Sequence, residues 1–248
     1  MPTTNATNTK LLLHCDGVDA STTFTDSSTA SVKTVTAEGN GQVDTAQSKF
    51  GGASLLCDGT GDGLSIPDHA DWAMGTGNFT VDFWVRFAAI GTEDGLIANS
   101  NAAFGVQDVN DTFDLRIDGA SSSNLQVLIY SAGTNTISMA AAHGMVTDTW
   151  YHIAIIRGWG GNANDWAITV AGSSIVTLTD ADPWPDFTSG FYMGFSARAG
   201  NQYLNGWMDE IRVLKGEAGW TANFTPPTEA YTIATASGFL NLLLLGAG

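Results

Sequence analysis

Three loops of the chain combine an aromatic ring with amide or carboxylate side chains. They span residues 159–165, 182–186 and 201–203, and each lies between runs with the character of strands. Sugars pack their CH faces on flat rings, and their hydroxyl groups need directional partners such as Asn, Asp and Gln. This chemistry predicts a carbohydrate-binding site whose candidate residues are Trp159, Asn162, Asn164, Trp184, Asp186 and Tyr203.

Trp184 is the strongest of these candidates, because it stands between Pro183 and Pro185. A ring on such a loop is hard to bury completely, which makes it the best candidate for a ring presented to a ligand. The alternative, which is favoured for either ring taken singly, is that Trp159 and Trp184 fold back over the edge of the core and have a structural role.

Catalytic patterns are missing from the sequence. Glycosidases of sandwich folds place carboxylates at a spacing of two on one strand, and the chain has no Glu-x-Asp-x-x-Glu run. It also has no Gly-x-Ser-x-Gly elbow, phosphate loop or paired Cys and His at a recognisable spacing. We therefore expect no enzyme activity, with glycoside hydrolysis as the less favoured alternative.

The charge of the chain argues against two kinds of partner. Its 25 acidic and 9 basic residues give a net charge of -16, and the basic residues are scattered singly. Nucleic acids and anionic membranes both require clustered Lys and Arg, so neither is expected as a partner. The acidity favours divalent cations, or it reflects a solvated surface in a salty medium.

The strands that must position the loops have a clear pattern. Residues 79–87 alternate apolar and polar side chains, which predicts one face in the core and one facing water. Residues 151–157 are apolar in both phases, as in a strand covered on both sides in the middle of a sheet. In residues 206–214, Asp209 shares a phase with Ile211 and Val213, whereas Glu210 and Arg212 share the other.

Glycine and Asn/Asp clusters divide the whole chain into short alternating runs of this kind. The pattern predicts a single all-β domain of two packed antiparallel sheets, with one helical turn at 217–223. The expected strands are residues 11–15, 54–57, 63–66, 79–87, 96–99, 104–107, 112–117, 125–130, 136–139, 151–157, 166–170, 174–178, 190–195 and 206–214.

Several of these segments resemble a known family in their order and spacing. They are Phe-Thr-Val-Asp-Phe-Trp at 79–84, Trp-Tyr-His-Ile-Ala at 150–154 and Met-Asp-Glu-Ile-Arg at 208–212. Together they are similar to concanavalin A-like, laminin-G-like jelly-roll domains. The resemblance implies a jelly-roll sandwich over residues 11–230, an N-terminal arm at 1–10 and an apolar C-terminal tail at 231–248. It also implies that the domain binds sugars or partner surfaces.

The resemblance further implies a structural Ca²⁺ ion. Asp209 matches the acid of the family's Asp-Glu-x-Arg strand, and Asp16 and Asp26 in the opening turn region would complete the site. Calcium takes six to eight oxygen ligands from carboxylates, carbonyls and water. The alternative is that Asp209 accepts hydrogen bonds from backbone amides or an arginine.

The opening segments at 11–16, 23–28 and 43–50 also resemble domains of phage and environmental virus structural proteins. Residues 1–10 lack the pattern of a signal peptide, which agrees with such a protein. The apolar run at 238–248 is shorter than the roughly 20 residues of a membrane span, so it is either a final strand or a docking tail. Cys15 and Cys57 are either a disulfide or two buried thiols.

These observations lead to one functional hypothesis with a runner-up. The protein is expected to be a non-catalytic carbohydrate-binding or adhesion module on a virion surface or fibre, exposed outside the cell, that recognises glycans. The alternative is a purely structural capsid, decoration or oligomerisation protein. In either case the expected partners are other virion proteins or copies of itself through the C-terminal tail, in a homo-oligomer.

Overall fold

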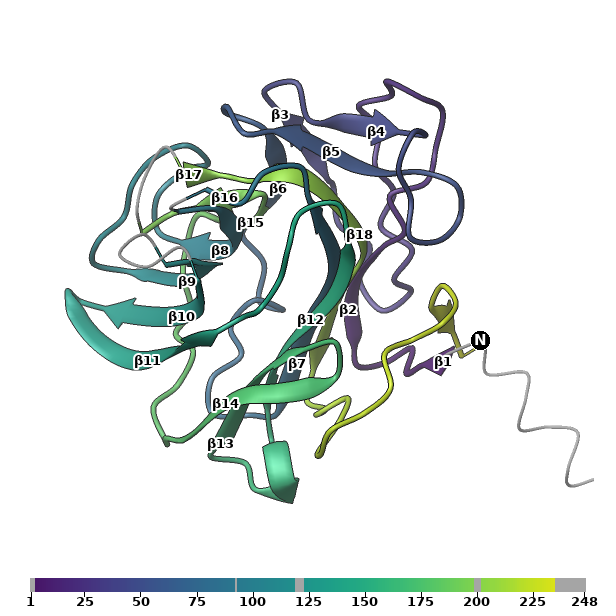
Figure 1. Ribbon diagram of the computed structural model, residues 1–248. Helices are drawn as coiled ribbons and strands as arrows, with labels where there is room; N and C mark the ends of the chain where they lie inside the picture. Colours follow the sequence, from purple (N-terminus) through teal and green to yellow (C-terminus); the bar gives the residue numbers. More distant parts are fainter. Residues whose placement is uncertain (1–2, 92, 119–122, 199–201, 235–248) are drawn as a thin grey trace, which may run out of the picture.

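The computed structural model describes residues 3–91, 93–118, 123–198 and 202–234, and these form a sandwich of two antiparallel sheets (Figure 1). The first sheet has seven strands in the order β11 (Thr134–Ala142), β10 (Asn124–Ser131), β9 (Thr112–Ile117), β8 (Gly95–Ser100), β15 (Gly190–Met193), β6 (Gly63–Pro67) and β3 (Thr36–Glu38). The prediction of an all-β, two-sheet antiparallel sandwich is confirmed.

The second sheet has eight strands. Its order is β14 (Ser173–Thr179), β13 (Asp165–Val170), β12 (Trp150–Arg157), β7 (Phe79–Phe87), β18 (Asn205–Lys215), β5 (Ser54–Asp58) and β4 (Gln42–Asp44), with β2 (Thr9–Leu13) also paired to β18. Two small sheets join β1 (Thr3–Thr4) to β19 (Thr232–Ile233) in parallel and β16 (Phe195–Ser196) to β17 (Gln202–Tyr203). One 3-10 turn, η1, spans Trp159–Gly161.

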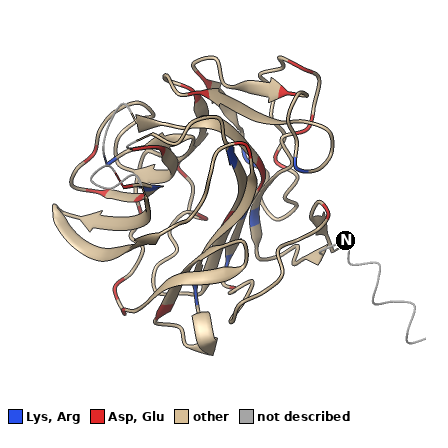
Figure 2. Cartoon of the chain, in the orientation of Figure 1, with Lys and Arg blue, Asp and Glu red and all other residues tan. Residues whose placement is uncertain are grey.

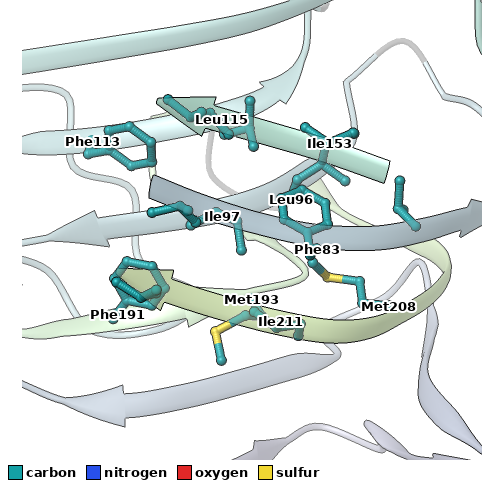
Figure 3. Packing of buried hydrophobic residues seen from close by; sticks show 14 of the residues in the cluster. Phe83, Leu96, Ile97, Phe113, Leu115, Ile153, Phe191, Met193, Met208 and Ile211 are labelled. Atoms are coloured by element: carbon teal, nitrogen blue, oxygen red, sulfur yellow. The ribbon is translucent and has the colours of Figure 1, made fainter. Parts of the chain in front are cut away.

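The main core fills the space between the two sheets (Figure 3). Phe83 of β7 and Ile153 of β12 pack there against Leu96 and Leu115 of the facing sheet, and all four side chains are buried. β12 lies between β13 and β7, so the expectation of a strand in mid-sheet is confirmed. The alternation of apolar residues therefore identified the core strands correctly.

The outer face of β7 differs from the prediction, because it is covered rather than wet. Asp82 is fully buried there and is bonded to Arg212 Nε at 2.9 Å, His152 Nε2 at 3.1 Å and the Tyr231 hydroxyl at 2.6 Å. Tyr231 belongs to the segment 217–233, which crosses this face after β18. A buried carboxylate needs such partners, and the returning chain supplies one of them.

A β-bulge in β18 changes the phase expected for Asp209. Glu210 has a left-handed φ of 49°, and the register with β7 shifts between Asp209 and Arg212. Asp209 pairs with Trp84 on the outer face, whereas Ile211 lies in the core. The prediction that Asp209 shares the core face was wrong. The bulge inserts one extra residue into the strand, and the alternation of apolar and polar residues in the sequence does not reveal it.

Two other local predictions were wrong. Residues 104–107 form a loop, since Gly105 has φ 79° and the Asp108 carboxylate accepts hydrogen bonds from the Asn110 and Asp111 amides. Residues 217–223 form no helical turn, because the Gly219 amide bonds instead to the Thr80 hydroxyl of β7.

The ends of the domain are tied to its body. In the expected arm, Thr4 is buried and belongs to β1, which pairs with β19. Tyr231, at the start of the expected tail, is buried as well, and residues 235–248 of that tail lie outside the described residues. Cys15 and Cys57 are buried free thiols. No helix in the described ranges has the length and apolar character needed to cross a membrane.

Candidate ligand-binding site

The outer face of the seven-stranded sheet carries a cluster of aromatic rings. Tyr192 of β15, Ala98 of β8 and Asp114 of β9 stand opposite one another across the sheet, so their side chains share this face. The hairpin of β16 and β17 folds over the face and brings Phe195 and Tyr203 against them. This arrangement forms a second, smaller apolar cluster outside the main core.

Phe104, from the loop that follows β8, completes the ring cluster. Its ring centroid lies 4.9 Å from Phe195, 5.8 Å from Tyr192 and 6.0 Å from Tyr203. Phe104 also rests on Gly63, where an added Cβ would lie 2.8 Å from the ring. Glycine at 63 is therefore required for this close approach. Phe104 and Tyr203 are both half-buried, so each ring keeps an exposed portion.

Asp114 fixes the hairpin over the sheet. The carboxylate is fully buried and accepts a hydrogen bond from the Ser196 hydroxyl at 2.9 Å and one from the Arg198 amide at 3.4 Å. Burial raises the pKa of Asp114 to about 6 despite these donors and the nearby Arg116. The position of Tyr203 therefore depends on a polar contact beneath it.

An open cleft of about 320 Å³ lies beside Tyr203. We call it the Tyr203 cleft. Its walls are the turn after β5, the loop between β7 and β8, β17 and the start of β18. The lining residues are Asp58, Gly59, Thr60, Ala89, Gly91, Glu93, Asp94, Gln202, Tyr203 and Asn205. Its volume is at the lower end of the roughly 300–1,000 Å³ that is typical of small-molecule sites.

A second open cleft, of about 290 Å³, lies beside Phe104. We call it the Phe104 cleft. Tyr192 and Phe104 line it together with polar groups, among them Ser65, whose hydroxyl donates to Glu38 at 2.5 Å. Because Phe104 and Tyr203 are in contact, the two clefts lie on either side of one aromatic cluster. The site thus combines two polar hollows with two half-exposed rings.

The Tyr203 cleft has a negative electrostatic character. Three of its lining residues are acidic, and none of the described residues that line it is Lys or Arg. A hydrogen bond from the Asn40 side chain lowers the pKa of Asp58, whereas burial raises the pKa of Asp94 to about 6. Figure 2 shows that acidic residues also predominate on the loops around the sheets.

Trp184 does not face a ligand: the structure excludes it as a binding residue and confirms the alternative of a ring folded back into the core. Its side chain is 0% exposed and stacks on Phe113, with the two ring centroids 3.7 Å apart. Its indole N–H donates a hydrogen bond to Asn99 Oδ1 at 3.0 Å. Its backbone also pairs with Gly75. The flanking prolines shape a loop that turns the ring inward, where Asn99 satisfies the one polar atom.

The remaining candidates fall into separate regions. Trp159 is half-buried on η1, and Asn162 and Asn164 are exposed in the loop that follows. Asp186 is exposed after Trp184. Figure 1 shows that β17, which carries Tyr203, lies at the opposite end of the molecule from β13, which follows the Trp159 loop. Tyr203 alone among the six candidates lines either of the two clefts.

The residues that surround Tyr203 were not predicted from the sequence. Phe104 was assigned to a strand, and Asp58 and Asp94 lie at strand ends far apart in the chain. One signal was present, because Asp58-Gly59 and Asp94-Gly95 are both Asp-Gly pairs directly beside apolar runs. Their convergence depends on strand order, which the sequence does not state.

The three predicted calcium ligands do not form a common site. Asp26 accepts hydrogen bonds from the Leu12, Ser28 and Lys33 amides, and Asp209 accepts those of Lys49, Phe50 and Glu210. Among residues 3–91, 93–118, 123–198 and 202–234, no three His, Cys, Asp or Glu side chains converge as metal ligands. The residues therefore do not fit the ion, and calcium stays a prediction of the resemblance alone.

The burial of Trp184 predicts that Trp184→Ala destabilises the fold. Removing a fully buried indole should lower the free energy of unfolding by about 3–5 kcal/mol, through lost burial and the cavity left behind. The measurement is chemical denaturation, with Trp159→Ala as the control for a half-buried ring on a loop. A loss for Trp184→Ala no larger than that of the control would show that the indole is not part of the core.

The raised carboxyl pKa values predict that the stability of the fold decreases as the pH rises from acidic to neutral. Burial raises the pKa of Asp94 and Asp114 to about 6 and that of Asp209 to about 7, from 3.8. In that window the folded state holds protons that the unfolded state has lost, so the free energy of unfolding decreases as pH rises. We expect greater stability near about pH 5 than near about pH 8.

The matched variant for this prediction is Asp209→Asn, which removes the titrating group and keeps an oxygen for the Lys49 and Phe50 amides. Its pH dependence should be weaker than that of the wild type. Asp186→Asn, which changes an exposed carboxylate, is the control. Equal pH profiles for all three proteins would contradict the role of Asp209.

Three solved structures have a similar fold. The binding domain of botulinum neurotoxin serotype D/C shares 12% identity with this chain at a TM-score of 0.64, covering 88% of this chain and 51% of its own. The binding domain of Paraclostridial Mosquitocidal Protein 1 shares 13% sequence identity at a TM-score of 0.60, and the match covers 89% of this chain and 50% of that domain's chain. The third structure is domain 4 of AbnA, a GH43 extracellular arabinanase from Geobacillus stearothermophilus, in complex with arabinotriose. It shares 18% sequence identity at a TM-score of 0.62, and the match covers 85% of this chain and 94% of that domain.

The chain thus spans about half the length of the toxin binding domains that it matches. At these identities the likeness concerns the fold. No curated protein matches the chain. Residues 58–220, more than half of the chain, match the laminin-G-type family described as the concanavalin A-like lectin/glucanases superfamily. These residues run from the last residue of β5 to the segment beyond β18, and the chain therefore belongs to the concanavalin A-like lectin/glucanase superfamily.

Proposed function

We propose that the protein is a non-catalytic carbohydrate-binding module whose ligand lies across the Tyr203 and Phe104 clefts. One observation carries this proposal: two half-exposed rings in contact with each other stand between two open polar hollows. Saccharides need both features, because their CH faces pack on rings while their hydroxyl groups bond to polar side chains.

The polar groups beside the rings suit sugar hydroxyls. Gln202 and Asn205 offer amide donors and acceptors in the Tyr203 cleft, and Ser65 and Ser189 offer hydroxyls in the Phe104 cleft. The arabinanase domain of similar fold, which is in complex with arabinotriose, supports a saccharide as the ligand class. The toxin binding domains of similar fold support recognition rather than catalysis as the role.

A glycan array followed by calorimetry on the strongest ligand tests this proposal. Tyr203→Ala should weaken binding about tenfold or more, because aromatic anchors at the centre of an interface contribute most of its affinity. Trp159→Ala should leave the affinity unchanged, since Trp159 lies at the other end of the molecule. Loss of binding in Trp159→Ala with no effect of Tyr203→Ala would move the site to the Trp159 loop and contradict the proposal.

Glycoside hydrolysis is a second candidate, favoured by one observation. The Tyr203 cleft is lined by Asp58, with a lowered pKa, and Asp94, with a pKa raised to about 6. Two carboxyl groups with pKa values shifted apart are the pairing that glycosidases use. Release of reducing sugar from a bound polysaccharide, abolished by Asp94→Asn, would replace the non-catalytic proposal with this one.

The place of the module on a virion surface or fibre remains part of the proposal, and it rests on the resemblance of the opening segments to virus structural proteins. Its rival is a structural capsid or decoration protein that assembles through the apolar run at 238–248, which lies outside the described residues. A stable oligomer lost on deletion of 238–248, together with no glycan binding, would favour the rival.

A further inference from the structure

We propose that the Tyr203 cleft takes a saccharide with a free amino group, held as an ammonium ion against the Asp94 carboxylate. This inference rests on the proposed carbohydrate-binding function and adds a chemical class to its ligand. The Asp94 carboxylate is largely buried at the cleft wall and leaves one oxygen without a protein donor among the described residues.

Asp94 is 4% exposed, and its carboxylate has one hydrogen-bond donor among the described residues. Its Oδ2 accepts one hydrogen bond, from the Gly91 amide at 2.7 Å. Its Oδ1 has no hydrogen-bond partner among the described residues, although the side chain lines the cleft. Oδ1 is not among the buried atoms that lack a partner, so it is open to the solvent of the cleft. A ligand that donates to it forms a charge-assisted hydrogen bond at a carboxylate that is otherwise largely shielded from water.

The surroundings of Asp94 favour a cationic donor over a neutral one. Glu93 and Asp58 line the same cleft, and no Lys or Arg stands among its described lining residues. The whole chain has a net charge of -16. An ammonium group would compensate charge that the protein leaves uncompensated, whereas a uronic or sialic acid would be repelled.

A metal ion fits the cleft less well than an organic cation. A divalent ion requires several oxygen ligands close together, and no three acidic, His or Cys side chains among the described residues converge in that way. The carboxylates are instead spread around a hollow of about 320 Å³. A ligand of sugar size can place its amino group at Asp94 and still reach the other walls.

The Tyr203 ring supplies the second half of this recognition. It is half-buried, and it lines the same cleft as Asp94. An aromatic ring attracts a cation through its electron-rich face and also packs against the CH groups of a sugar. An amino sugar presents both features to one ring, which neither a simple amine nor a neutral sugar does.

Calorimetry with a matched pair of ligands tests this inference. The probes are the β-1,4-linked glucosamine trisaccharide and its fully N-acetylated counterpart, at neutral pH and physiological salt, with trilysine as a control for charge alone. We expect the free amine to bind about tenfold or more tighter than the acetylated sugar, as a charged hydrogen bond at a partly buried site implies. Trilysine should bind more weakly than the amino sugar.

Two variants with the same change of charge separate the site from the general acidity of the protein. Asp94→Asn should abolish the preference for the free amine, and Asp186→Asn, at an exposed carboxylate outside the clefts, should preserve it. Asp94→Asn removes an uncompensated buried charge, so we expect it to fold, which a thermal melt verifies.

The outcomes distinguish this inference from the function on which it rests. Equal or tighter binding of the acetylated sugar, with loss in Tyr203→Ala, would overturn the amino-sugar inference and leave the carbohydrate-binding function standing. Trilysine binding as tight as that of the amino sugar, or an equal effect of the two Asn variants, would also overturn the inference. Failure of every glycan on the array would overturn the function itself.

Discussion

A buried carboxylate must be given partners, and the outer face of each sheet carries such a group. Asp82 on the eight-stranded sheet is matched by Arg212, His152 and the Tyr231 hydroxyl, which the segment 217–233 brings back over the face. Asp114 on the other sheet is matched by Ser196 at the start of the β16–β17 hairpin. The need of these buried carboxylates for hydrogen-bond partners is therefore met by segments that fold back over the outer faces of the sheets.

The candidate site is a consequence of that constraint on the seven-stranded sheet. The hairpin held at Asp114 carries Phe195 and Tyr203 to Phe104, and so builds an aromatic cluster that neither sheet contains alone. The clefts form where this cluster meets the turns at the sheet edge. Asp94 differs from Asp82 and Asp114, because the chain supplies its second oxygen with no donor among the described residues.

The sheets and their core could be predicted from the sequence, because burial of one face imposes a period of two on strands such as β7 and β12. Three features could not. The bulge at Glu210 reverses the phase of Asp209 without any sign in the alternation. Trp184 is buried because Asn99, a residue distant in the chain, satisfies its indole N–H. The site around Tyr203 depends on strand order, so only Tyr203 itself was found.

The central claim is that saccharides bind at the ring cluster on the outer face of the seven-stranded sheet. The most direct measurement is the mapping of backbone amide chemical shifts by NMR during titration with a glycan that binds. We expect perturbations centred on Phe104, Asp58, Asp94 and Tyr203. Perturbations centred on the loop at 159–165, with none around Tyr203, would contradict it.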